Sequence, residues 1–207
     1  QLKVSDKDVE KQIQAKLKNA GEKKLTEAFI KKNTDNECKT KAEYEKRVRE
    51  QLEKDKKNSV GSELLSKVSG DSKLKKTPKL QLKAAKKDVE QNYEQMASQY
   101  GMDVDSLIKA YGMDEKSYQA MVKNSAKESV KLHLVAHAIA KEEGIRLSSS
   151  DYDQRLKEFK ESTGLSEKQF KKQAGSSYED YAKENNFEEY FFQEKVGQFL
   201  VDKATAK

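Results

Sequence analysis

Apolar side chains recur every three to four residues along most of this chain, the spacing that lines one face of an α-helix. The most regular stretch, Asp114 to Lys160, predicts a long amphipathic helix that ends at Gly144 and a second helix that starts at Ser148. The apolar face of the long helix consists of Tyr118, Met121, Val122, Ala126, Val130, Leu134, Ala138 and Ile139. No segment alternates with period two for long enough to form a strand, so the chain is predicted to be all-α.

A capping pattern marks three helix starts. In each, a serine is followed three residues later by an aspartate or a glutamine, so that each side chain can satisfy the other residue's backbone N–H group. The serines are Ser5, Ser148 and Ser166. The last helix, Phe187 to Leu200, has the most aromatic face of all, and Phe191 and Phe199 are expected to be buried in it.

Two further long helices are expected in the first half of the chain. The first opens at Thr40 and either crosses solvent at its charged segment, Glu53 to Asn58, or breaks near Asn58 to Gly61. The second starts at Pro78, and its seven-residue apolar period favours an antiparallel helical partner. The segment from Gly101 to Gly112 is expected to form the tip of a helical hairpin.

Charged residues make up 38% of the chain and hydrophobic residues 34%. The charged share exceeds the roughly 25% of an average soluble protein, which indicates an elongated helical protein with thin cores. The net charge is +6, and basic and acidic residues are interspersed at helical spacing, as on solvated helix faces. The aromatic residues follow helical core spacing, so nucleic acid is not expected as a partner. No apolar run reaches about 18 residues, so no membrane span is expected.

The sequence offers little for catalysis or metal binding. His133 and His137 lie four residues apart, which would let one helix hold a metal ion, but no glutamate stands between them as in zinc proteases. Two ordinary surface histidines are therefore expected. No nucleophile elbow or phosphate-binding loop is present, and the single Cys38 cannot form an internal disulfide. We predict no catalytic residue, no metal site and no cofactor.

Methionines and tyrosines gather around the expected hairpin tip. Methionine is flexible and polarizable, so a surface built from it can adapt to varied apolar partners. Such residues are ordinary core in many helical proteins, but a hairpin has little core near its tip, so some of them should be exposed. The candidate polypeptide-binding residues are Tyr93, Met96, Tyr100, Met102, Tyr111, Met113, Tyr118 and Met121.

Two phrases carry a resemblance to a known family: KLHLVAHAIAKEEGIRLSSSDYDQRL, and EKVGQFLVDKA near the end. They resemble the C-terminal domain of trigger factor, a bacterial chaperone that works without ATP, and the likeness covers most of the chain from about Leu25. The peptide-binding domain of SurA-type foldases is similar. The resemblance implies an elongated, discontinuous helical domain in which helical-hairpin arms surround a long central helix.

The resemblance also implies a domain organisation. Residues 1–207 would form a single helical chaperone domain, in which residues 1–21 are a linker-type helix that packs on the body and residues 22–207 form the body and two arms. The arms are expected around Leu82 to Tyr118 and around Ser148 to Gly175, with unfolded polypeptides held in a cleft between them.

The implied function is that of an ATP-independent chaperone, which binds unfolded or nascent polypeptides in a helical cradle and assists protein folding and transport. In the family, an FKBP-like isomerase domain would be inserted after the linker-type helix, but here only Ala20 and Gly21 lie between Asn19 and Glu22. The ribosome-binding domain of the family has no counterpart in this sequence either. Neither enzymatic activity nor ribosome docking is therefore expected. A homodimer is one option for assembly.

An alternative function belongs to a different class. A helical adaptor or structural module would bind one defined protein partner, whereas a chaperone would protect several unrelated ones. The resemblance implies a cytoplasmic protein, but the sequence before Gln1 is not given, so an extracytoplasmic location, secreted or lipid-anchored, is the alternative.

Overall fold

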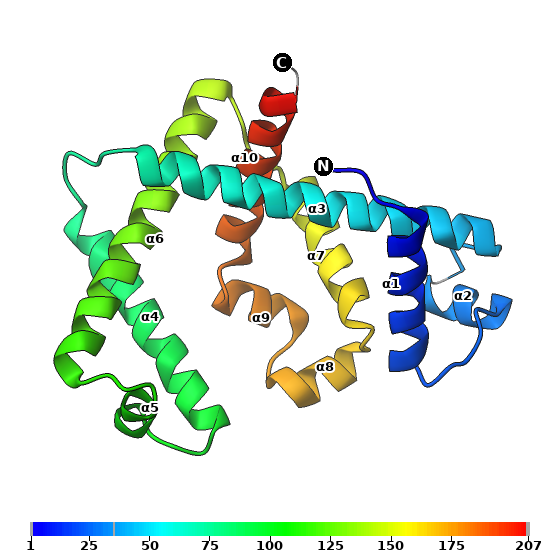
Figure 1. The fold of residues 1–207 in the computed structure, drawn as a ribbon, viewed down its shortest axis with the longest axis horizontal. Coiled ribbons are helices and arrows are strands. Elements are labelled where there is room, and N and C mark those ends of the chain that lie inside the picture. Colours follow the sequence, from blue (N-terminus) through cyan, green and yellow to red (C-terminus); the bar gives the residue numbers. More distant parts are fainter. Residues whose placement is uncertain (1, 35, 206–207) are drawn as a thin grey trace. The chain divides into compact units, whose positions relative to one another are not determined.

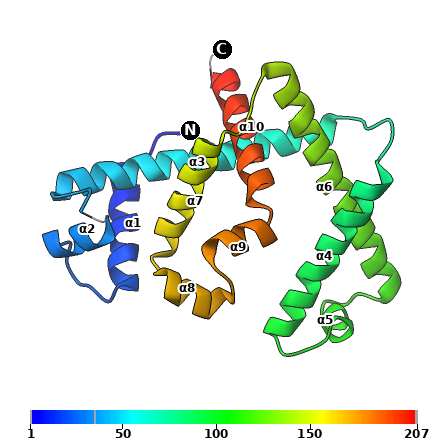
Figure 2. The ribbon, with the colours of Figure 1, turned by 180° about the vertical axis from the view of Figure 1, so that it is seen from behind.

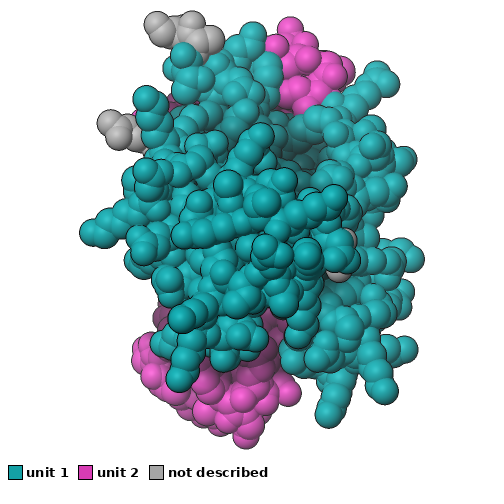
Figure 3. Space-filling view, turned by 90° about the vertical axis from the view of Figure 1, so that its right-hand side faces the viewer, with its two compact units in different colours: residues 1–64, 146–207 teal, residues 65–145 magenta. Residues whose placement is uncertain are grey.

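The computed structural model describes residues 2–34 and 36–205, so Gln1 lies outside it. All regular elements of these residues are helices (Figure 1), which confirms the all-α prediction. The helices are α1 (Asp6–Asn19), α2 (Glu27–Asn33), α3 (Lys41–Asp71), α4 (Lys79–Gln99), α5 (Val104–Ala110), α6 (Glu115–Glu143), α7 (Ser149–Thr163), α8 (Glu167–Ala174), α9 (Tyr178–Glu184) and α10 (Phe187–Thr205). They form two compact units, unit 1 (residues 1–64 and 146–207) and unit 2 (residues 65–145), which Figure 3 distinguishes by colour.

The N-terminal core of unit 1 lies between α1, α2 and the first half of α3. The buried face of α1 consists of Val9, Ile13 and Leu17, which lie four residues apart and therefore on one side of the helix. Phe29 from α2 meets Tyr44 from α3 edge to face, with ring centroids 6.2 Å apart. The first helix therefore packs on the two helices that follow it.

The three capping boxes are present as predicted. At the start of α7, the Asp151 N–H donates to Ser148 Oγ at 3.1 Å, and the Ser148 N–H donates to Asp151 Oδ2 at 2.9 Å. The ammonium group of Lys195, on α10, donates to the same carboxylate at 2.6 Å. These hydrogen bonds, first that of Lys195 and then those of Ser148, hold the pKa of Asp151 well below its ordinary value.

Stability should therefore decrease in acid. The pKa values of the cap carboxylates Asp8, Asp103, Asp114 and Asp151 all lie below the ordinary 3.8. The chief cause is hydrogen bonds from a serine at the helix start for the first three, and the hydrogen bond from Lys195, followed by those of Ser148, for Asp151. A carboxylate whose pKa is lower in the folded than in the unfolded state stabilises the protein at pH values above the unfolded-state pKa. This stabilisation is lost as the pH falls toward and through the folded-state pKa. We expect the melting temperature to depend little on these groups above about pH 5 and to fall below about pH 4.

Thermal melts across this pH range check the prediction. Asp151→Asn should flatten the acid part of the profile, because one of the groups that takes up a proton is gone. The matched control is Asp153→Asn, since Asp153 is exposed on the same helix and lies outside the capping box. Equal acid profiles for the two variants would contradict the assignment.

The helix α3 runs without a break from Lys41 to Asp71, so the break considered near Gly61 does not occur. The glycine serves a close approach of two backbones instead. A Cβ added to Gly61 would lie 2.6 Å from the carbonyl carbon of Gly197 in α10, and one added to Gly197 would lie 2.8 Å from that of Gly61. Only glycine allows the helices to cross at this distance.

The charged segment of α3 does not simply cross solvent either. Lys54 forms an ion pair with Glu158 of α7, and the side chain of Asn58 is buried and donates to Glu194 of α10 at 3.2 Å. The polar groups of this stretch therefore bind partners that are distant in the sequence, through an ion pair and a hydrogen bond. The helical pattern alone could not predict these partners.

The C-terminal core of unit 1 is formed by α7, α8, α9 and α10. The short helix α9 was not predicted. The ring of Phe159 on α7 lies 4.8 Å from that of Phe187 and 5.9 Å from that of Tyr178. The prediction that Phe191 is buried is confirmed. The same prediction for Phe199 is wrong, because this ring is partly exposed and lies under the ammonium group of its own helix neighbour Lys203.

In unit 2, α4 and α6 run antiparallel and α5 connects them at one end, as the two opposite views show (Figures 1 and 2). Small residues, Ala85 of α4 and Ala126 of α6, let the two helices approach in the middle. Toward α5, Ile108, Tyr118 and Val122 form a second small core. The predicted hairpin and its antiparallel pairing are confirmed.

Candidate functional site

The eight candidate binding residues all lie in unit 2, around α5 and the adjacent ends of α4 and α6. The structure divides them into an inner and an outer set. The inner residues, which are buried or half-buried, are Tyr93, Met113, Tyr118 and Met121. The outer residues are Met96, Tyr100, Met102 and Tyr111, with exposed fractions of 36%, 64%, 38% and 55%.

The inner set has a structural role. The rings of Tyr93 and Tyr118 meet edge to face at 5.3 Å, and Met113 and Met121 pack against the same small core. Burial is the main cause that raises the pKa of Tyr118, with nearby Glu90 as the next. For these four residues, the alternative that they are ordinary core describes the structure better.

The outer set consists of four exposed side chains around two backbone turns, which together we call the tip patch. The backbone turns at Gly101 and Gly112, both with left-handed φ angles of 67° and 70°, and brings the end of α4 beside the end of α5. There the hydroxyl of Tyr111 donates to the sulfur of Met96 at 3.5 Å, so the two side chains are in contact. Sulfur and aromatic groups on two short turns can repack around different apolar partners.

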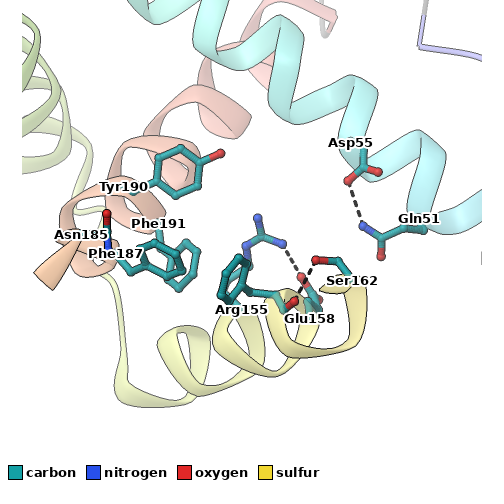
Figure 4. A pocket seen from close by; sticks show the side chains of 10 residues that line it. Gln51, Asp55, Arg155, Glu158, Ser162, Asn185, Phe187, Tyr190 and Phe191 are labelled. Carbon is teal, nitrogen blue, oxygen red and sulfur yellow. Dashed lines mark hydrogen bonds and ion pairs between the residues drawn. The ribbon is translucent and has the colours of Figure 1, made fainter. Parts of the chain in front are cut away.

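A concave surface lies within unit 1, between α3, α7 and α10. It is a pocket of about 400 Å³. Figure 4 shows Phe187, Tyr190 and Phe191 on one side, Asp55 on the other, and the guanidinium group of Arg155 between them. Tyr190 is 56% exposed. The pocket therefore combines an aromatic wall with charged groups.

Partly buried charged side chains, Arg155 and Glu158, form the floor of this pocket. The Arg155 Nε–H donates to the carboxylate of Glu194 at 3.0 Å. Arg155 also forms an ion pair with Glu158, and Glu158 forms a second ion pair with Lys54. Burial opposes the charge of Arg155, but Glu194 and Glu158 outweigh it and raise its pKa. Burial, followed by the negative charge of Glu194, raises the pKa of Tyr190.

This pocket was not among the sequence-based candidates. A signal did exist, because the last helix has the densest aromatic face in the chain. The partners that make the face concave, Asp55 and Arg155, come from helices far away in the sequence. Periodicity within α10 could not identify them.

Three residues were considered for metal or redox chemistry: His133, His137 and Cys38. The rings of His133 and His137 lie side by side on α6, with centroids 4.3 Å apart. Cys38 is a buried thiol in the N-terminal core of unit 1. None of the helices in residues 2–34 and 36–205 combines the length and the apolar character needed to cross a membrane.

Comparison with known proteins gives one consistent result. A family profile described as the bacterial trigger factor protein C-terminus matches residues 39–202. The trigger factor of Halothermothrix orenii is 35% identical over 68 residues, which cover 33% of this chain and 16% of that protein. The trigger factor of Staphylococcus saprophyticus is 28% identical over 123 residues, or 59% of this chain and 28% of that protein.

The trigger factor of Macrococcus caseolyticus is 34% identical over 76 residues, which cover 37% of this chain and 18% of that protein. The matches thus span less than a third of each of these curated relatives. No solved structure matches the chain significantly. The family profile extends from the start of α3 into α10 and so includes both units. The chain therefore belongs to the family of bacterial trigger factor C-terminal domains.

Proposed function

We propose that this chain binds unfolded or nascent polypeptides without ATP and protects them from aggregation, and that the tip patch is a principal contact surface. Membership of the trigger factor family gives the chain a chaperone-related role. The observation that supports the finer proposal is the exposure of Met96, Tyr100, Met102 and Tyr111 together at one end of a helical hairpin. Contiguous exposed apolar side chains are typical of interaction surfaces.

The chemistry of the tip patch suits a varied set of clients. Methionine side chains change rotamer easily, and tyrosine presents an apolar ring with a polar hydroxyl, so neither requires one particular client sequence. A small patch of this kind should bind weakly, because only a limited apolar area leaves water on contact. Weak, adaptable binding without catalysis is the property that a holding chaperone needs.

The pocket of unit 1 provides a second contact. Its aromatic wall can accept an apolar or aromatic client side chain, while the charged floor keeps the empty pocket hydrated. We propose that it acts with the tip patch by avidity, since two weak sites on one client bind more tightly than either site alone.

A triple variant tests the role of the tip patch. Tyr100→Ser, Met102→Ser and Tyr111→Ser together should reduce the suppression of aggregation several-fold for several unrelated denatured clients. The melting temperature should stay close to that of the parent, because all three side chains are exposed and surface substitutions usually change stability by less than about 0.5 kcal/mol each. Light scattering of the client and thermal melts of the chaperone are the measurements.

The matched control is Val68→Ser, because Val68 in the same unit has the same exposed fraction, 38%, as Met102. It should protect clients as the parent does. Protection should also scale with the molar ratio of protein to client, as for stoichiometric binding. Full protection by a folded triple variant would exclude the tip patch, and protection of one client alone would favour an adaptor.

A further inference from the structure

The excess positive charge of this chain is concentrated in one segment. Residues 72–87 contain seven lysines and no aspartate or glutamate. Of the 42 basic residues, 35 lie outside this segment, where they are balanced by all 36 acidic residues. The interspersed charge pattern described for the chain as a whole therefore does not hold here. This segment is the loop before α4 and its first turns.

Among the described residues, the seven lysines have no acidic partners. They are Lys73, Lys75, Lys76, Lys79, Lys83, Lys86 and Lys87, of which all but Lys86 are exposed. None of them forms an ion pair within the part of the chain that the structure describes. On α4, Lys79, Lys83 and Lys87 follow one another at four-residue intervals, an arrangement of like charges that slightly destabilises a helix. The arrangement thus does not serve the stability of α4.

An apolar side chain stands in the middle of this basic surface. Leu80 is 84% exposed, more than any other large hydrophobic residue described. The inner face of α4, with Leu82 and Ala85, packs on α6, so Leu80 belongs to the outer face together with Lys79 and Lys83. A basic helix face with a protruding leucine is typical of segments that lie on anionic membrane surfaces.

We propose that residues 72–87 form a docking surface for anionic phospholipid, which the protein contacts from the water side without spanning the bilayer. The lysines would lie at the level of the headgroup phosphates, and Leu80 would insert into the boundary with the acyl chains. RNA is a poorer match. The segment has no aromatic residue on which a base could stack and no arginine for bidentate phosphate contacts, and an RNA backbone offers Leu80 no apolar environment.

Vesicle co-sedimentation with the full chain tests the proposal. The protein should bind vesicles of phosphatidylcholine mixed with phosphatidylglycerol and not bind phosphatidylcholine alone. Salt at about 1 M should release it, because the screening length then falls to roughly 3 Å. Lys79→Gln, Lys83→Gln and Lys87→Gln together should weaken the partition coefficient about 100-fold, given about 1 kcal/mol per lysine at an anionic surface.

The matched control makes the same change of charge on α6, with Lys116→Gln, Lys123→Gln and Lys127→Gln, all at exposed positions of the same unit. It should retain most of the binding. Neither triple variant should melt at a lower temperature, since lysine and glutamine have similar helix propensities. Equal loss of binding in both variants would overturn the proposal in favour of a general effect of net charge.

Leu80→Gln separates lipid from other polyanions. It leaves every lysine in place and should weaken vesicle binding on the order of tenfold, because the apolar insertion is lost. Binding to single-stranded RNA or to polyglutamate should be weak and unaffected by this change. The proposal is overturned if the parent binds either polymer as well as it binds the anionic vesicles, or if Leu80→Gln leaves the partition coefficient unchanged.

Discussion

Gly61→Ala is expected to destabilise the protein by about 1–3 kcal/mol, the usual cost of forcing an extra methyl group into a fully packed contact. The new Cβ would lie 2.6 Å from the backbone of Gly197, and a backbone cannot rotate out of the way as a flexible side chain can. The helices α3 and α10 would have to separate at their crossing. Chemical denaturation of the variant and the parent measures the difference.

The expected loss of stability on Gly61→Ala is opposite in sign to the usual effect of this substitution. In an ordinary helix, replacing glycine by alanine stabilises by up to about 1 kcal/mol. Gly70→Ala, near the end of the same helix, is the matched control, because nothing lies within 4 Å of its added Cβ. It should be neutral or stabilising. Stabilisation by both substitutions would show that the crossing is looser than the structure describes.

Arg155→Met is expected to cost about 3–5 kcal/mol, the usual effect of removing one partner from a buried ion pair. The side chain of Glu194 is only 6% exposed, so its carboxylate would remain buried with the Asn58 amide as its neighbour. The pocket would also lose the group between its aromatic wall and Asp55. Equilibrium unfolding gives the loss of stability directly.

Two comparisons make this prediction specific. Lys157→Met removes the exposed ion pairs with Glu37 and Glu161 and should change the stability much less, because solvent already screens these charges. Combining Arg155→Met with Glu194→Met should recover much of the lost stability, because no unpaired charge remains buried. A loss below about 1 kcal/mol for Arg155→Met alone would mean that water solvates Glu194 in the folded protein.

The local signals in the sequence predicted most helix boundaries. The capping boxes at Ser5, Ser148 and Ser166 and the C-cap at Gly144 are where their residue types indicate, because capping depends on groups within one helical turn. The buried face of α1 and the pairing of α4 with α6 also follow from helical periodicity. The position of the candidate tip residues at a hairpin end follows from the same local rules.

Exposure within that candidate set could not be predicted. Tyr118 and Tyr111 are both tyrosines near the same turn, yet Tyr118 is buried against Tyr93 and Tyr111 is exposed. Which ring turns inward depends on the contacts that α5 makes with its neighbours. The aromatic pocket of unit 1 likewise requires three helices from separate parts of the chain, so a single helical face did not reveal it.

The sequence by itself thus determined that this protein is all-helical, where most of its helices begin and end, and which family it resembles. Only the tertiary structure decided the role of Gly61, which looks like a helix breaker in its local context and is a contact with Gly197 in the folded chain. The same holds for Asn58 and Glu194, which meet across 136 residues of sequence. The physical reason is range: caps and periodicity act within a few residues, whereas close packing and charge burial depend on partners that folding brings together.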